Sequence, residues 1–101
     1  MSEEKGKTLF REMGYSTGEF CGVLPAAMRD WPITGGPDAW QVSTAGGDVI
    51  ATIRIQPMPE RAMGSLRLPV LAVTIDLEAA SPDQASEFIR RFERGFHRGG
   101  G

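Results

Sequence analysis

The sequence predicts an α+β fold, a two-layer sandwich in which an antiparallel sheet of about four strands is closed by a C-terminal amphipathic helix. Two observations favour this fold class. In the second half of the chain, apolar and polar residues alternate in two runs, which is the period of half-buried strands. Close to the C-terminus the apolar residues change to the spacing of one helix face. The expected order of elements is β-short α-β-β-β-α.

The closing helix is expected over residues 81–98. Ser81 is a good N-cap, Pro82 suits the first turn and Gln84 completes a capping box. One apolar stripe then follows, made of Ala85, Phe88, Ile89, Phe92 and Phe96. Because three phenylalanines on one face need a partner surface, we expect this helix to pack on the sheet. Its arginines are expected on the solvated side.

Two long strands are expected before this helix. The first covers residues 49–56, with Val49, Ala51, Ile53 and Ile55 on its apolar face. The second covers residues 71–78, with Leu71, Val73, Ile75 and Leu77 on the matching face. Residues 57–65, rich in Pro and Gly, are interpreted as a connection. The apolar phase is reversed before Pro69, which indicates a bulge or the start of the strand there.

The first half of the chain is less regular. We expect one or two helical turns over residues 8–13 and a short strand over 19–24. A short helix over 25–31 is expected next, followed by a loop over 33–39. A strand over 40–44 leads into a glycine turn and completes the meander.

Length and composition predict one small soluble domain spanning residues 1–101, with residues 1–7 frayed and 99–101 forming a flexible tail. The chain holds 101 residues, of which 41% are hydrophobic, enough for one core. Its net charge of −2 gives no long-range attraction to nucleic acid or to anionic membranes. We therefore expect neither as a partner.

Cysteine usage indicates a cytoplasmic setting. The single cysteine cannot form an intramolecular disulfide, and one Cys with one His cannot build a zinc site, so no metal or cofactor is expected. The first residues lack the apolar stretch of a signal peptide, and no run approaches the ~20 apolar residues that span a bilayer.

No catalytic motif is apparent. Cys21 and His97 form the one nucleophile–base pair on offer, but they fall in different expected elements and no local signature surrounds either. The glycine pairs at 35–36 and 46–47 match neither a Walker loop nor the dinucleotide fingerprint. The terminal Arg98 and glycines resemble the diglycine tail of ubiquitin-like modifiers, although a helix is expected to lead into them here. The sequence therefore favours a protein that is not an enzyme.

The second face of the expected sheet is the main candidate site. If Ile53 opposes Leu71, this face is a mixture of apolar and polar side chains, and the methionines of the connection lie beside it. The candidate interface consists of Ile50, Thr52, Val70, Ala72, Met58 and Met63. Phe10 and Tyr15 of the N-terminal segment offer an alternative, since they could cover this face.

These observations lead to two hypotheses. The leading one is a non-catalytic binding or accessory module that acts through protein contacts, with a protein partner or as a homodimer. The alternative is a small-molecule or anion-binding domain, or a small enzyme, that uses Arg54, Arg61 and Arg67. The alternative requires the three guanidinium groups to converge in one pocket.

Overall fold

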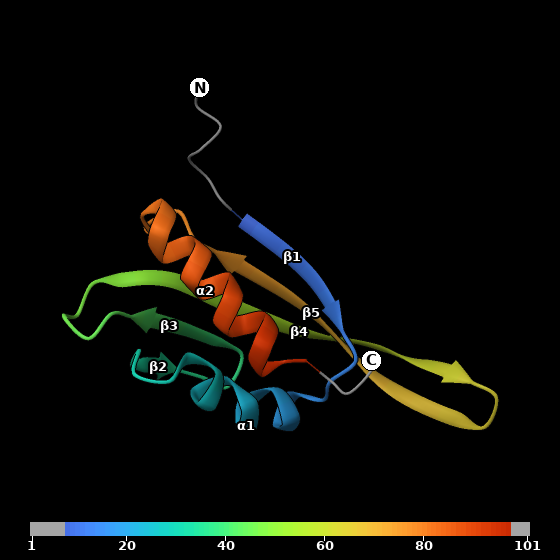
Figure 1. Cartoon of the computed structure of the whole chain (residues 1–101). Coiled ribbons are helices and arrows are strands. Elements are labelled where there is room, and N and C mark those ends of the chain that lie inside the picture. The colour runs from blue at the N-terminus through green and yellow to red at the C-terminus, as the bar shows by residue number, and fades with distance from the viewer. Residues whose placement is uncertain (1–7, 98–101) are drawn as a thin grey trace.

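The computed structural model describes residues 8–97, so the expectations for residues 1–7 and 98–101 lie outside the described part (Figure 1). The elements, in chain order, are β1 (Thr8–Met13), α1 (Thr17–Met28), β2 (Ile33–Gly35), β3 (Ala39–Ser43), β4 (Val49–Met63), β5 (Leu66–Asp76) and α2 (Pro82–Gly95). All neighbouring strands are antiparallel, in the order β1-β5-β4-β3-β2. The α+β class with a closing helix is confirmed, and the sheet has five strands instead of about four.

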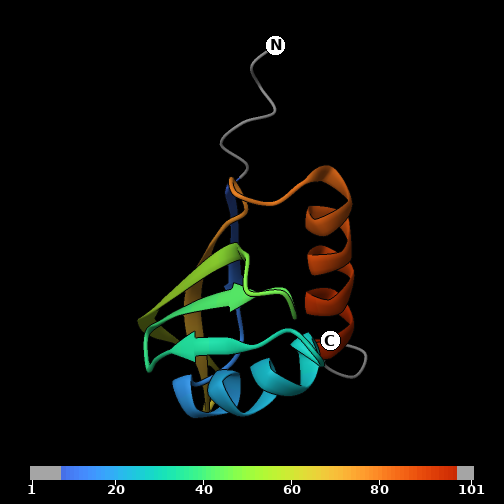
Figure 2. The ribbon, with the colours of Figure 1, turned by 90° about the vertical axis from the view of Figure 1, so that its left-hand side faces the viewer.

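The closing helix α2 begins as the sequence predicts and lies across one face of the sheet (Figures 1 and 2). The Ser81 hydroxyl accepts from the Gln84 amide at 3.1 Å, and the Gln84 side chain accepts from the Ser81 amide at 2.9 Å. This reciprocal pair satisfies two of the free N–H groups of the first turn. The apolar stripe is buried except for Ile89, which is half-buried, and Phe88 and Phe92 pack against the sheet core.

The core lies between the sheet and the two helices. Leu71, Val73 and Ile75 of β5 form its floor, and α1 adds Phe20 and Leu24 from the side. The Phe20 ring stacks on Phe96 with centroids 4.7 Å apart and lies 5.6 Å from Trp40. Within residues 8–97 no charged or polar residue is buried in this core. One aromatic cluster therefore joins α1, α2 and β3.

The expected helical turns at residues 8–13 are wrong, because this segment is the edge strand β1. It pairs with β5 from Thr8 opposite Asp76 to Met13 opposite Leu71. Its alternation turns Leu9 and Met13 toward the core and leaves Phe10 exposed. A free sheet edge supplies the hydrogen bonds for this conformation, and tertiary context of this kind overrides weak local propensity.

The expected strand at 19–24 is also wrong, because these residues lie in the helix α1. The helix expected over 25–31 is present as the last turn of α1, which begins earlier and ends at Met28. Ser16 and Glu19 form a capping box with distances of 3.1 and 2.9 Å. Phe20, Leu24 and Ala27 are then buried at helical spacing. The loop expected at 33–39 contains the short strand β2, which pairs with β3.

The connection expected at 57–65 is wrong as well, because β4 continues to Met63 and only Gly64 and Ser65 form the turn. The Ile55 amide donates to the Asp38 carbonyl on the β3 side, at 2.9 Å. The nitrogen of Pro57 faces the same side, but β3 does not extend as far as Pro57. The proline therefore loses no hydrogen bond of the sheet. Gly64 has a φ of 63°, which suits the first position of a two-residue hairpin turn.

Two bulges set the register of β4. Val42 opposes Ala51 whereas Ser43 opposes Val49, which leaves Ile50 as an extra residue. Further along, Pro59 and Glu60 lie together opposite Pro69. The expected bulge near Pro69 is thus present, and its extra residue belongs to the partner strand. Ile53 opposes Ile75, four residues from the Leu71 pairing expected from the sequence.

Candidate functional site

The sheet face that α2 does not cover, the open face, is a surface on which apolar, polar and charged side chains are mixed. Residues directly opposed on neighbouring strands share a face, so the strand register identifies its members. They are Thr8, Phe10 and Glu12 of β1; Leu66, Leu68, Val70, Ala72, Thr74 and Asp76 of β5; Thr52, Arg54, Gln56, Met58, Arg61 and Met63 of β4; Ala39 and Gln41 of β3; and Thr34 of β2. All of them are exposed or half-buried.

One end of the open face is carried by a projecting hairpin, residues 58–70, which we call the arm (Figure 1). Here β4 has run past β3 and β5 has run past β1, so both edges of the two-stranded ribbon are unpaired. Four of the six large apolar residues that are exposed in residues 8–97 belong to the arm: Met58, Met63, Leu66 and Leu68. Leu66 is 61% exposed. A two-stranded ribbon is marginally stable alone, so an exposed apolar arm is typical of a contact surface.

The second bulge makes the apolar side of the arm continuous with the open face. An unbroken alternation along β4 would turn Arg61 and Met63 toward the helix side, away from Met58. The extra residue at Pro59–Glu60 reverses the phase, so that Arg61 lies opposite Leu68 and Met63 lies opposite Leu66. Met63 and Met58 therefore share one face of the molecule.

Five of the six predicted interface residues lie on the open face: Thr52, Met58, Met63, Val70 and Ala72. Ile50 does not. The Ile50 side chain lies in the core and is only 1% exposed. Ile50 is the extra residue of the first bulge, and Val49 is turned toward solvent in its place. The expectation for Ile50 and Val49 is therefore corrected.

The described residues of the N-terminal segment, from Thr8 on, do not cover the open face. Phe10 is part of the face and is 60% exposed, whereas Tyr15 lies in the core with its hydroxyl donating to the Phe96 carbonyl at 3.0 Å. Sequence reasoning missed Leu66 and Leu68 as members of the site. The sequence signal for them was the alternation itself, since Leu66 and Leu68 are at even positions whereas the core residues of β5 after Pro69 are at odd positions.

The structure does not bring the three predicted arginines together. Arg54 lies in the body of the sheet opposite Thr74. Arg61, on the arm, is 3.7 Å from Glu12. Arg67 lies on the other side of the arm, opposite Ala62, and its guanidinium is 3.5 Å from Glu60. Two of the three are thus neutralised separately, and this geometry gives no support to a convergent anion site.

An open hollow of about 630 Å³ lies in the body of the open face. Phe10 of β1, Thr74 and Ala72 of β5, and Arg54 and Gln56 of β4 contribute to its lining. The Phe10 side chain gives it an apolar edge, and Arg54 and Asp38 add one charge of each sign.

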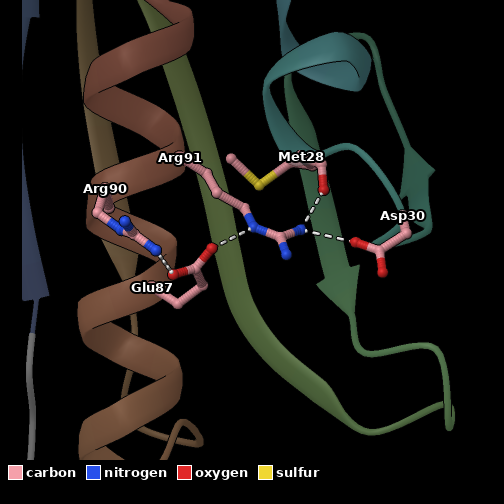
Figure 3. Close-up of polar contacts among 5 residues, drawn as sticks. All are labelled: Met28, Asp30, Glu87, Arg90 and Arg91. Atoms are coloured by element: carbon pink, nitrogen blue, oxygen red, sulfur yellow. Dashed lines mark hydrogen bonds and ion pairs between the residues drawn. The ribbon is translucent and has the colours of Figure 1, made fainter.

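A second charged cluster, around Arg91, joins the two helices (Figure 3). The Arg91 guanidinium donates to the Met28 carbonyl at 2.6 Å, to Asp30 at 2.9 Å and to Glu87 at 2.8 Å. It also lies over the Trp31 ring, 4.0 Å from its centroid. Arg91 is therefore not part of a solvated face, because it holds α2 to the C-terminal end of α1.

The charges of this cluster shift the pKa values of its members. Hydrogen bonds from Arg90 and then Arg91 lower the pKa of Glu87 to about 2. The hydrogen bond from Arg91 lowers the pKa of Asp30, and the bond to Glu87 raises the pKa of Arg91. The adjoining groove between the helices, about 290 Å³, also has Arg29 and Arg94 in its lining. Because Arg90 bonds to Glu87, and Arg91 bonds to Glu87, Asp30 and the Met28 carbonyl, these two arginines have a structural role.

Other chemistry is sparse in residues 8–97. The Cys21 thiol faces the Pro37 carbonyl at 3.9 Å, and no hydrogen bond joins it to His97 in this part of the chain. No group of three or more metal-ligating side chains occurs in the same residues. Neither described helix has the length and apolar character needed to cross a membrane.

The fold and the open face define the class of this molecule as a small α+β domain in which one sheet face is exposed within residues 8–97. No protein-family model matches the chain, and no curated protein matches its sequence.

Proposed function

We propose that the protein is a non-catalytic binding or accessory module that acts through protein contacts made by the open face and its arm. The observation that carries the proposal is the concentration of exposed apolar residues on the arm, where Met63 and Leu66 lie opposite each other at the tip. Apolar surface of this kind is costly to leave in water and usually marks a contact with another protein.

The charges of the open face support a protein partner over a nucleic acid. Glu12 and Asp76 are balanced by Arg54 and Arg61, so the face has no single sign. A nucleic-acid surface needs an excess of cationic groups to replace counterions along the phosphates. We place the module in the cytoplasm, since a lone cysteine suits a reducing compartment.

Adjacent residues of the arm give a matched test. Met63 lies on the open face, whereas Ala62 is exposed on the opposite face of the same strand. Met63→Asp and Ala62→Asp thus add the same charge at neighbouring positions. Using tagged chain as bait in native lysate, we expect Met63→Asp to lose the captured proteins and Ala62→Asp to retain them. Equal capture by both variants, with both folded by circular dichroism, would contradict the proposal.

A further inference from the structure

We propose that the occupant of the open face is a second copy of this chain. Two copies face each other with their arms antiparallel, related by a two-fold axis that crosses the strands at the Met58–Val70 pair. This inference rests on the proposed function and deepens it by naming the partner. The argument comes from three properties of the face: its spacing, its charge and its extent.

The spacing along β5 is symmetric about Val70. Leu66, at the tip of the arm, is four residues before Val70, and Thr74, in the hollow, is four residues after it. At about 3.3 Å per residue, each lies ~13 Å from the axis. The two-fold rotation therefore places Leu66 of each copy over Thr74 of the other, beside Phe10. The apolar tip of one arm then enters the hollow of about 630 Å³ in the body of the other copy.

The charges fit the same rotation. Arg61 lies opposite Leu68, two residues on one side of Val70, and Glu12 lies opposite Ala72, two residues on the other side. The rotation brings Arg61 of one copy level with Glu12 of its partner along the strands. The two residues lie on opposite sides of β5, about 10 Å apart across the sheet. Their long side chains can span β5, as they already do within one chain. Arg54 falls level with Met63 of the partner, so no like charges meet. Each dimer contains two such Arg61–Glu12 contacts, because a two-fold interface repeats every contact.

The overlap between the two copies is long and narrow. It runs from Leu66 to Thr74, about 26 Å along β5, and each arm in it is two strands wide. Such an overlap is smaller than the ~800 Å² per partner of a standard interface, so we expect a dimer whose population depends on protein concentration. Pairing also covers the exposed Leu66, Met63 and Phe10 side chains simultaneously.

Charge reversal tests the contact between copies. We expect sedimentation of the full chain to show a dimer, and Arg61→Glu or Glu12→Arg alone to weaken it by at least about tenfold, since like charges then meet. An equimolar mixture of these two variants should regain the wild-type affinity as a heterodimer, because both of its contacts again join opposite charges. The Arg61–Glu12 pair within one chain cannot be restored by mixing. A monomeric wild-type chain, or a mixture that stays as weak as its components, overturns the inference.

Cross-linking tests the axis. In a Cys21→Ser background, Val70→Cys should be joined between copies by a short bis-maleimide, because both Val70 residues lie at the axis. Leu66→Cys should not be joined, since the two Leu66 positions lie about 26 Å apart in the dimer. The reverse result overturns this geometry. A monomeric chain that still captures another protein through Met63 would overturn the dimer and leave the proposed function standing. A monomeric chain that captures no protein through Met63 would overturn both the dimer and the proposed function.

Discussion

Gly95 at the end of α2 lies directly against Ala27 of α1, so that a Cβ built on Gly95 would be 2.9 Å from the Ala27 Cα. The two helices therefore touch through backbone. Helix propensity alone predicts that Gly95→Ala stabilises the protein. We expect the opposite, a loss of about 1–3 kcal/mol in the free energy of unfolding, because the added methyl forces the helices apart. Urea denaturation measures this loss.

Gly22→Ala is the matched control for that substitution. Gly22 is exposed within α1 and a Cβ there would meet nothing within 4 Å. The same change should stabilise the protein by up to about 1 kcal/mol, since only the helix propensity changes. If Gly95→Ala also stabilises, the close helix contact is not what determines glycine at this position.

Arg91 is expected to matter far more than its neighbour Arg90. The Arg91 side chain is 17% exposed and bonds to the end of α1, whereas the Arg90 side chain is 68% exposed and bonds to Glu87. Charge-assisted hydrogen bonds contribute ~1.5–3 kcal/mol, and exposed ion pairs typically contribute ~0–1 kcal/mol. Arg91→Ala should therefore lower the midpoint of urea unfolding clearly more than Arg90→Ala. Similar effects of the two would show that the Met28 carbonyl and Asp30 are not significant partners.

The depressed pKa of Glu87 predicts the pH dependence of the helix contact. The folded pKa is about 2 and the ordinary value is 4.5. The unfolded chain therefore binds the proton first, so this contribution to stability is complete above pH 4.5 and is lost as the pH falls toward 2. Asp30, whose pKa is also lowered, acts with the same sign.

NMR titration of the Glu87 side-chain carboxyl checks the Glu87 value directly. Glu87→Gln should flatten the dependence of unfolding free energy on pH in the same window while leaving a smaller slope from Asp30. A Glu87 midpoint near its ordinary value would contradict the ion-pair geometry of Figure 3.

Phenylalanines on the two sides of the sheet should behave oppositely. Phe88 is fully buried and Phe92 nearly so, and removal of such a ring costs ~3–5 kcal/mol before any carboxylate is buried. Phe88→Asp or Phe92→Asp should therefore abolish the cooperative thermal transition. Phe10→Asp, on the exposed open face, should keep it. A normal melt for Phe92→Asp would contradict the packing of α2 on the sheet.

Much of the second half could be predicted because its signals are local. The capping box at Ser81 and the phenylalanine stripe define α2 within one stretch of chain, and a period of two defines the inner parts of β4 and β5. The capping box at Ser16 and Glu19 marked α1 equally well, but Gly18, Gly22 and Pro25 weakened the helical pattern beyond it. Edge strands β1 and β2 left no such signal, because neighbouring strands complete their hydrogen bonds.

The candidate site depended more strongly on tertiary pairing. Alternation placed Thr52, Val70 and Ala72 on one face, but it could not place the bulges, since each bulge is a mismatch between two strands. A one-residue mismatch moved Ile50 into the core, and another brought Met63 to the side of Met58.

The sequence by itself determined the α+β class, the closing helix and its buried stripe, because helix caps and apolar periodicity act within a few neighbouring residues. Only the tertiary structure decided that Arg54, Arg61 and Arg67 lie apart and that the arm and Phe10 share one open face. Those outcomes follow from strand order and register, which depend on contacts between residues far apart in the chain.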